Sequence, residues 1–114
     1  MSSRSKAKGS AYELEVVRKH REMGVAAEKM PLSGALGGKY AGDIKLFNGG
    51  MRGECKRRKK GFTTLYKALA QDGGNDICFV RDDNQETLVV MPWETYQEFL
   101  KWSDIPQRYP AFNP

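Results

Sequence analysis

An Asn-Gly pair at positions 48–49 constrains the fold of this chain more than any other feature. It separates two short strand-like runs, 43–47 and 51–56. Both central residues of a type I′ turn need a positive φ, which Asn and Gly adopt readily, so the pair predicts a tight β-hairpin. Counting back along the two strands from a two-residue turn places Asp43 directly opposite Glu54.

The alternation of side chains along a strand sorts the residues of this hairpin onto two faces. Lys56 shares a face with Glu54, whereas Ile44 and Cys55 point the other way, toward a core. Two carboxylates directly opposite each other repel and destabilise a sheet. A divalent cation offsets that repulsion, and carboxylate oxygens suit Mg²⁺ or Mn²⁺. The alternative is a solvated hairpin on which Asp43, Glu54 and Lys56 exchange surface ion pairs of little energetic value.

Positive charge is concentrated next to these acidic residues. The 114 residues include 19 Lys and Arg against 14 Asp and Glu, a net charge of +5, which suits an anionic partner without choosing between nucleic acid and membrane. Residues 56–60 form an unbroken run of cations that begins at Lys56. We expect this run to contact a phosphate backbone, and the few aromatic residues around it favour backbone recognition over base readout.

Several classes of protein are disfavoured by the sequence. No apolar run approaches the length of a membrane span, and the amino terminus does not resemble a signal peptide. Cys55 and Cys78 are too few for a disulfide framework, so we expect reduced thiols in an intracellular protein. His20 is the only histidine and is expected on a helix surface. A single histidine excludes most zinc-hydrolase sites. The glycine-rich segment 31–42 lacks the Walker A order, so no nucleotide cofactor is expected.

The first half of the chain predicts a basic flexible arm followed by a helix. The arm covers residues 1–9 and the helix runs from Ala11 to Met23, with Ser10 as its N-cap. Glu13 lies three residues after Ser10, so a capping box alone would explain this glutamate. Its alternative role is to turn inward toward the acidic hairpin. A short strand at 25–30 precedes the glycine-rich loop.

The second half adds two strands between two helices. A helix is predicted at 63–71, strands at 76–80 and 87–91, and a last helix from Pro92 that carries an apolar face. The continuous apolar character of 76–80 is typical of a strand covered on both faces. The order of elements predicts one α/β domain, residues 10–102, with a central mixed β-sheet flanked by helices and an irregular tail at 103–114.

Four short motifs, taken in their order along the chain, resemble the PD-(D/E)XK nuclease superfamily, and within it the archaeal-type Holliday junction resolvases, including short phage versions. They are Lys8-Gly9-Ser10-Ala11-Tyr12-Glu13, Ser33-Gly34, Gly42-Asp43-Ile44 and Glu54-Cys55-Lys56. The resemblance covers roughly residues 4–91. It implies a restriction-endonuclease-like fold and Mg²⁺-dependent cleavage of phosphodiesters in four-way DNA junctions by a homodimer, with Mn²⁺ able to substitute.

The resemblance also implies roles for individual residues. Glu13, Asp43 and Glu54 become metal ligands, Lys56 the catalytic lysine, and Ser33 the loop serine that approaches the scissile phosphate. The residues expected to hold the DNA backbone are Arg4, Lys6, Lys8, Lys39, Arg57, Arg58, Lys59 and Lys60.

This chain departs from the family pattern at two positions. Leu14 stands where many relatives carry Arg, and Gly42 replaces the usual proline. Two alternative functions stay open. One is a nuclease of the same superfamily acting on other branched, nicked or linear duplex DNA. The other is a non-catalytic DNA-binding protein.

Overall fold

The computed structural model of the chain describes residues 3–30 and 43–105. Helices and small β-sheets are both present, which confirms the α/β class. The chain divides into two compact units, Met1–Arg57 with Ser103–Pro114, and Arg58–Trp102. We call them unit 1 and unit 2 and describe each by itself. The expectation of a single domain at 10–102 stays a prediction.

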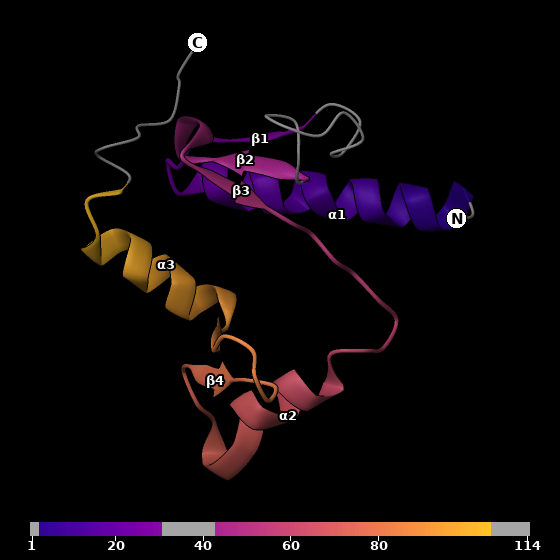
Figure 1. Ribbon diagram of the computed structural model, residues 1–114. Coiled ribbons are helices and arrows are strands. Elements are labelled where there is room, and N and C mark those ends of the chain that lie inside the picture. Colours follow the sequence, from indigo (N-terminus) through magenta and orange to yellow (C-terminus); the bar gives the residue numbers. More distant parts are fainter. Residues whose placement is uncertain (1–2, 31–42, 106–114) are drawn as a thin grey trace. The chain divides into compact units, whose positions relative to one another are not determined.

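Unit 1 consists of one long helix packed on a three-stranded sheet (Figure 1). The helix is α1 (Ser3–Glu22), and the strands are β1 (Ala27–Lys29), β2 (Ile44–Leu46) and β3 (Met51–Gly53). The sheet order is β1-β2-β3 and both pairs are antiparallel.

Apolar side chains from α1 and from two of the strands form the core of unit 1. Val17, Ala27 and Ile44 are buried together, and Leu46 and Cys55 pack against them. The predicted inward direction of Ile44 and Cys55 is therefore confirmed. Alternate residues of β2 reach this core because successive side chains of a strand point to opposite faces.

The connection between β2 and β3 confirms the predicted turn. Asn48 and Gly49 have φ values of 55° and 90°, and the Gly50 amide donates to the Phe47 carbonyl at 3.1 Å. Phe47 itself has a φ of 55° and is buried, so β2 ends one residue earlier than predicted. β3 begins where predicted but ends at Gly53, three residues earlier. The pairing of Ile44 with Gly53 is the predicted register.

Two predictions about α1 are wrong. The helix begins at Ser3, not near Ser10, so residues 3–9 continue it where a flexible arm was expected. Ala, Lys and Arg in that segment are good helix formers. His20 is only 2% exposed, and its Nδ1 donates to the Val16 carbonyl at 2.7 Å. Burial lowers the pKa of this imidazole, the Val16 bond opposes that shift, and the charge of Lys19 adds to it.

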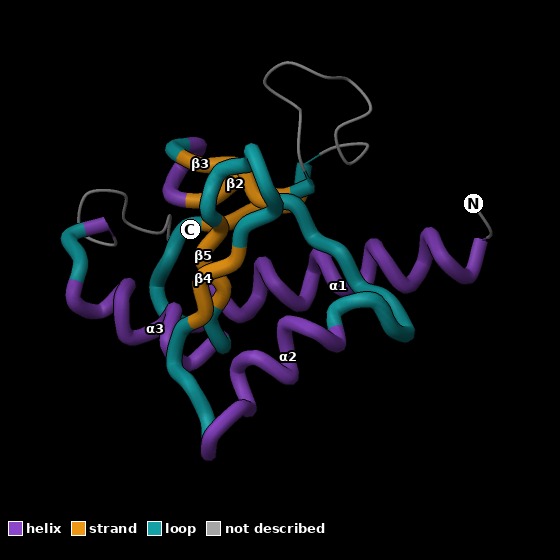
Figure 2. The backbone as a smooth tube through the Cα atoms, turned by 60° about the horizontal axis from the view of Figure 1, so that its bottom comes forward, coloured by secondary structure: helices purple, strands orange, loops and turns teal. Residues whose placement is uncertain are grey.

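Unit 2 contains two helices and one β-hairpin. Its elements are α2 (Thr63–Ala70), β4 (Cys78–Val80), β5 (Leu88–Val90) and α3 (Trp93–Trp102), with a 3-10 turn at Gln71–Gly73. β4 and β5 pair antiparallel and lie side by side in Figure 2. The Pro92 carbonyl accepts the first helical hydrogen bonds of α3 from Thr95 and Tyr96. The proline thus directly precedes the helix, one position before the first helical residue that it was predicted to be.

The predicted central mixed sheet is not observed. Every strand pair in residues 3–30 and 43–105 is antiparallel, and the pairs belong to two separate sheets. Residues 81–87 are too few for the crossover of about a dozen residues that a parallel β4–β5 pair needs. The restriction-endonuclease-like fold therefore stays a prediction.

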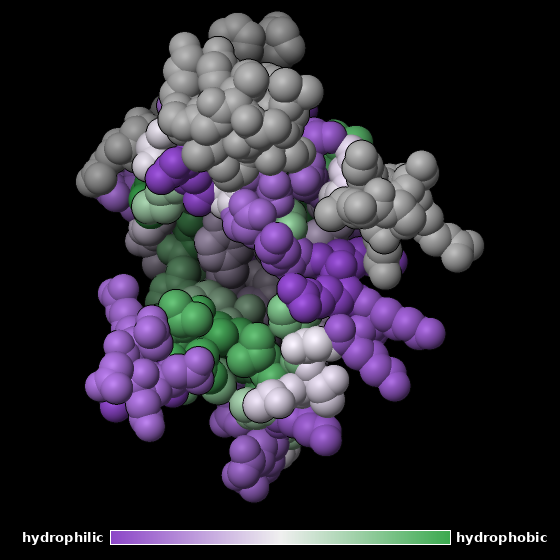
Figure 3. All heavy atoms as spheres, turned by 45° about the vertical axis from the view of Figure 1, so that its right-hand side comes forward, coloured by the Kyte–Doolittle hydropathy of each residue, from purple (hydrophilic) through white to green (hydrophobic). Residues whose placement is uncertain are grey.

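The hairpin of unit 2 is less covered than its sequence predicts. Phe79, Leu88 and Val89 are more than half exposed, where covered strand faces were expected. Figure 3 shows hydrophobic side chains, in green, gathered at the surface in the lower part of the view. The continuous apolar run reflects the β-propensity of these residues, and in this hairpin it does not imply burial.

Candidate active site

The hairpin of unit 1 places Asp43 and Glu54 across from each other. The Asp43 amide donates to the Gly53 carbonyl at 3.0 Å, and Asp43 Oδ2 accepts from the Cys55 amide at 2.9 Å. Asp43 is thus bonded to both neighbours of Glu54, Gly53 and Cys55, and lies across the hairpin from Glu54. The counting from the Asn-Gly turn is confirmed.

Asp43 is buried, and its backbone and one carboxylate oxygen are fixed by the hairpin. The Met30 amide donates to the Asp43 carbonyl at 2.9 Å, which ties the residue to the chain after β1 as well. A carboxylate oxygen that accepts a backbone amide is held in one orientation and satisfies a donor at the end of the ladder. Asp43 therefore has a structural role in addition to any chemical one.

Glu13 is also buried, and its environment excludes the capping-box explanation. Because α1 begins at Ser3, Ser10 lies inside the helix and is not its N-cap. Ser10 Oγ instead accepts from Lys29 Nζ at 2.6 Å, and the same ammonium lies 3.6 Å from Glu13 Oε2. Glu13 therefore turns inward toward the sheet, the alternative that the sequence left open.

Cys55 shows how closely the acidic residues approach one another. The pKa of its thiol is raised to about 11, mainly by burial and then by the negative charges of Asp43, Glu13 and Glu54, in that order. Like charges disfavour a thiolate only when they are near it. Asp43 and Glu54 of the hairpin therefore flank Cys55, and the charge of Glu13, on α1, reaches the same thiol. We call these three acidic residues the acidic cluster.

Glu54 and Lys56 form the exposed side of the acidic cluster. Lys56 Nζ lies 3.5 Å from Glu54 Oε1, and both side chains are more than half exposed. Such an exposed pair contributes little to stability. Its exposure also leaves both groups accessible to a ligand from solution.

The donor chemistry of the acidic cluster fits a hard divalent cation, because three carboxylates supply only oxygen ligands. Across the described segments, 3–30 and 43–105, no group of three or more His, Cys, Asp or Glu side chains is arranged to hold a metal ion. Glu13 is paired with Lys29, and one oxygen of Asp43 is taken by Cys55. A metal ion would thus compete with Lys29 for Glu13, whereas Asp43 could offer its second oxygen while keeping the Cys55 amide.

The remaining predicted site residues fall in three groups. Arg57, Arg58, Lys59 and Lys60 are exposed in the connection that follows β3. The Arg58 guanidinium lies 5.8 Å from the centre of the Phe62 ring, a cation–π distance. Arg4, Lys6 and Lys8 lie on the first turns of α1. Ser33 and Lys39 lie outside the described residues.

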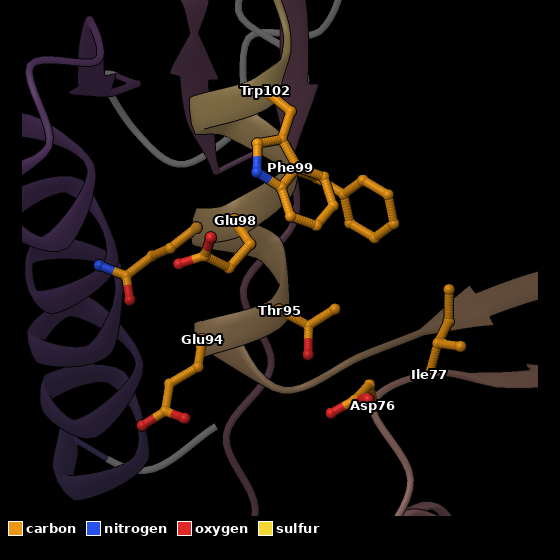
Figure 4. A pocket seen from close by; sticks show the side chains of 8 residues that line it. Asp76, Ile77, Glu94, Thr95, Glu98, Phe99 and Trp102 are labelled. Carbon is orange, nitrogen blue, oxygen red and sulfur yellow. The ribbon is translucent and has the colours of Figure 1, made fainter.

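A separate open groove of about 670 Å³ lies in unit 2, against α3 (Figure 4). Glu94 and Glu98, four residues apart, project from the same side of the helix, and Asp76 adds a third carboxylate. Acidic walls repel phosphate, so this groove is unsuited to a nucleic-acid backbone.

Sequence reasoning missed two residues of the site. Lys29 lies two residues after the buried Ala27, on the same face of β1, and a lysine at an inward strand position was the available indication. Cys55 was predicted to be buried, but its position amid the acidic residues follows only from how α1 packs.

Comparison of the chain with protein-family models, with curated proteins and with solved structures found no match. No helix within the described parts of the chain is long and apolar enough to cross a membrane.

Proposed function

We propose that this protein is a metal-dependent endonuclease that resolves four-way DNA junctions by paired phosphodiester hydrolysis. The proposal includes a restriction-endonuclease-like fold and a homodimer with two active sites. The observation that carries it is the placement of Asp43 across the hairpin from Glu54, with the Asp43 carboxylate fixed by the Cys55 amide and the charge of Glu13 acting on the same thiol. The exposed cations at 57–60 follow this hairpin in the sequence. The order of the four sequence motifs supports the same activity.

Clustered carboxylates favour a catalytic role over binding alone. Acidic residues that face a polyanion weaken its binding unless a cation compensates them. A bound Mg²⁺ supplies charge compensation and Lewis acidity toward a phosphodiester. Glu13, Asp43 and Glu54 would hold the ion, with Mn²⁺ as a substitute.

The other residues of the hairpin have separate tasks. The Cys55 amide fixes the orientation of Asp43, so this carboxylate does not need to be ordered when substrate binds. Lys56 presents an exposed ammonium 3.5 Å from Glu54, where it can donate a hydrogen bond to a phosphate oxygen that gains charge. Arg57 to Lys60 would hold the DNA backbone, together with Arg4, Lys6, Lys8 and Lys39. Ser33 would approach the scissile phosphate.

The test is cleavage of a labelled four-way junction beside a matched linear duplex, in Mg²⁺, in Mn²⁺ and in EDTA. We expect paired symmetric nicks in the junction alone, lost in EDTA. Asp43→Asn should abolish cleavage and preserve or tighten junction binding, because it removes a negative charge while keeping an acceptor for the Cys55 amide. Asp76→Asn, in the acidic groove of unit 2, is the matched control and should cut normally.

The other possible outcomes would each contradict a different part of the proposal. Cleavage of both substrates would indicate a nuclease of broader specificity. Tight binding without cleavage in either metal would indicate a non-catalytic DNA-binding protein. Full activity of Asp43→Asn would refute the assignment of the acidic cluster as the metal site.

A further inference from the structure

Lys29 of β1 contacts two side chains of α1, one of which is the buried Glu13 of the acidic cluster. Its ammonium donates to Ser10 Oγ at 2.6 Å and lies 3.6 Å from Glu13 Oε2. Ser10 and Glu13 are three residues apart and therefore share one face of α1. Along β1, Ala27 is buried and Glu28 exposed, so alternation returns Lys29 to the side of the sheet that carries α1.

A second lysine of the same sheet provides an internal comparison. Lys45 on β2 lies 3.8 Å from Glu28, and the two lysine side chains are equally exposed, at 31% for Lys45 and 32% for Lys29. Their partners differ, because the side chain of Glu28 is 61% exposed and that of Glu13 only 9%. Water solvates Glu28 whether or not Lys45 is present. Glu13 has little water, so its charge depends on nearby protein groups.

We propose that Lys29 is a positioning residue of the acidic cluster and acts as its internal cation when no divalent ion is bound. The proposal rests on the function proposed above, since it concerns the same site. The ammonium holds the Glu13 carboxylate in place beside Ser10 and lowers the cost of burying its charge. A divalent ion that approaches Glu13 must share this carboxylate with Lys29 or displace the ammonium. Lys29 therefore sets how tightly the site binds metal as well as where Glu13 points.

Removal of the ammonium should have opposite effects on the metal-free protein and on metal binding. Lys29→Met retains most of the aliphatic side chain but removes the ammonium that lies 3.6 Å from the buried Glu13 carboxylate. We expect the midpoint of thermal unfolding, Tm, to fall by roughly 4–8 °C in EDTA. We also expect Mg²⁺ and Mn²⁺ to bind roughly tenfold more tightly, because a competing positive charge is gone. A residue with a merely structural role would weaken stability and metal binding together.

The experiment measures Tm in EDTA, and metal affinity by isothermal titration calorimetry with Mn²⁺ or Mg²⁺ alone, on the full chain. Lys29→Arg keeps the charge and should resemble the wild type in both measurements. Lys45→Met removes the matched lysine and should change neither Tm nor affinity appreciably. If Lys29→Met is unfolded, the double variant Glu13→Gln/Lys29→Met decides, because neutralising the buried carboxylate should restore folding. A double variant that also fails to fold would overturn the proposal.

Two further results would overturn the inference and leave the nuclease proposal standing. One is a Tm loss for Lys29→Met no larger than that for Lys45→Met. The other is a metal affinity of Lys29→Met equal to or weaker than that of the wild type. Absence of metal binding in the wild type and in every variant would instead refute the nuclease proposal, and this inference with it.

Discussion

Cys55 allows the convergence of the acidic cluster to be measured without any assay of activity. Its pKa is raised from 9.0 to about 11, first by burial and then by the charges of Asp43, Glu13 and Glu54. At pH 8 a rise of two units lowers the thiolate fraction by roughly a hundredfold, and the thiolate is the species that alkylating reagents attack. Neutralising one acidic residue should recover part of that factor. Asp43→Asn should raise the alkylation rate by roughly threefold, the factor that corresponds to half a pKa unit.

The assay uses the Cys78→Ser background, in which Cys55 is the only thiol because the chain contains two cysteines. Iodoacetamide labelling is followed by mass spectrometry at several pH values, so that the change in ionisation is separated from a change in access. Glu13→Gln and Glu54→Gln should also accelerate labelling, and Asp76→Asn, in unit 2, should not. Labelling rates in all three cluster variants equal to that of Asp76→Asn would refute the convergence of these carboxylates around Cys55.

Three other expectations concern pH, packing and charge. The folded protein keeps His20 neutral where the unfolded chain binds a proton, so this contribution to stability is fully present above pH 6.5 and is lost as the pH falls through the lowered pKa. Urea unfolding between pH 5 and 7.5 should therefore show a steeper loss for the wild type than for His20→Gln, by at most about 1.4 kcal/mol per pH unit, and equal slopes would contradict the assignment. Gly53→Ala should lower the free energy of unfolding by roughly 1–3 kcal/mol, because its Cβ would lie 2.8 Å from Cγ1 of the buried Ile44. Gly9→Ala, in α1, should instead stabilise by about 0.5–1 kcal/mol, because the new Cβ has nothing beyond its own helix backbone within 4 Å, and urea titration distinguishes the two. Replacing Arg57 and Arg58 by Gln should weaken binding to any DNA and reduce the slope of log affinity against log salt by about 2, measured by fluorescence anisotropy, whereas an unchanged slope would place the basic run away from DNA.

Local chemistry made the hairpin of unit 1 predictable. Asn48 and Gly49 form the turn because both tolerate a positive φ. The length of this turn then fixes the register that sets Asp43 opposite Glu54. Helix and strand types followed from hydrophobic periodicity. The inward direction of Ile44 followed from alternation and is confirmed by its burial beside Val17.

The failures concern features that depend on contacts distant in sequence. Ser10 has the chemistry of an N-cap, but α1 begins seven residues earlier, in a segment that mixes the helix formers Arg, Lys and Ala with two serines and a glycine. The Ser10 hydroxyl instead accepts a hydrogen bond from Lys29. His20 is polar, but the packing of α1 buries it. The predicted mixed sheet required strand partners that no local pattern specifies, and the short β4–β5 connection selects an antiparallel hairpin.

The strands of unit 1 lie in the sheet in the same order as in the chain, which has a consequence for how the acidic cluster assembles. Each strand pairs with its sequence neighbour, and α1 packs on the strand that follows it. Topologies built from such neighbouring contacts have low contact order and fold fast, because little chain entropy is lost before each contact forms. Pulse-labelling hydrogen exchange should therefore show the amides of Met30 and Cys55, bonded to Asp43, gaining protection together with those of β2. Joint protection of these amides would mean that pairing of the strands brings Asp43 and Glu54 together in a single kinetic step, in spite of their mutual repulsion.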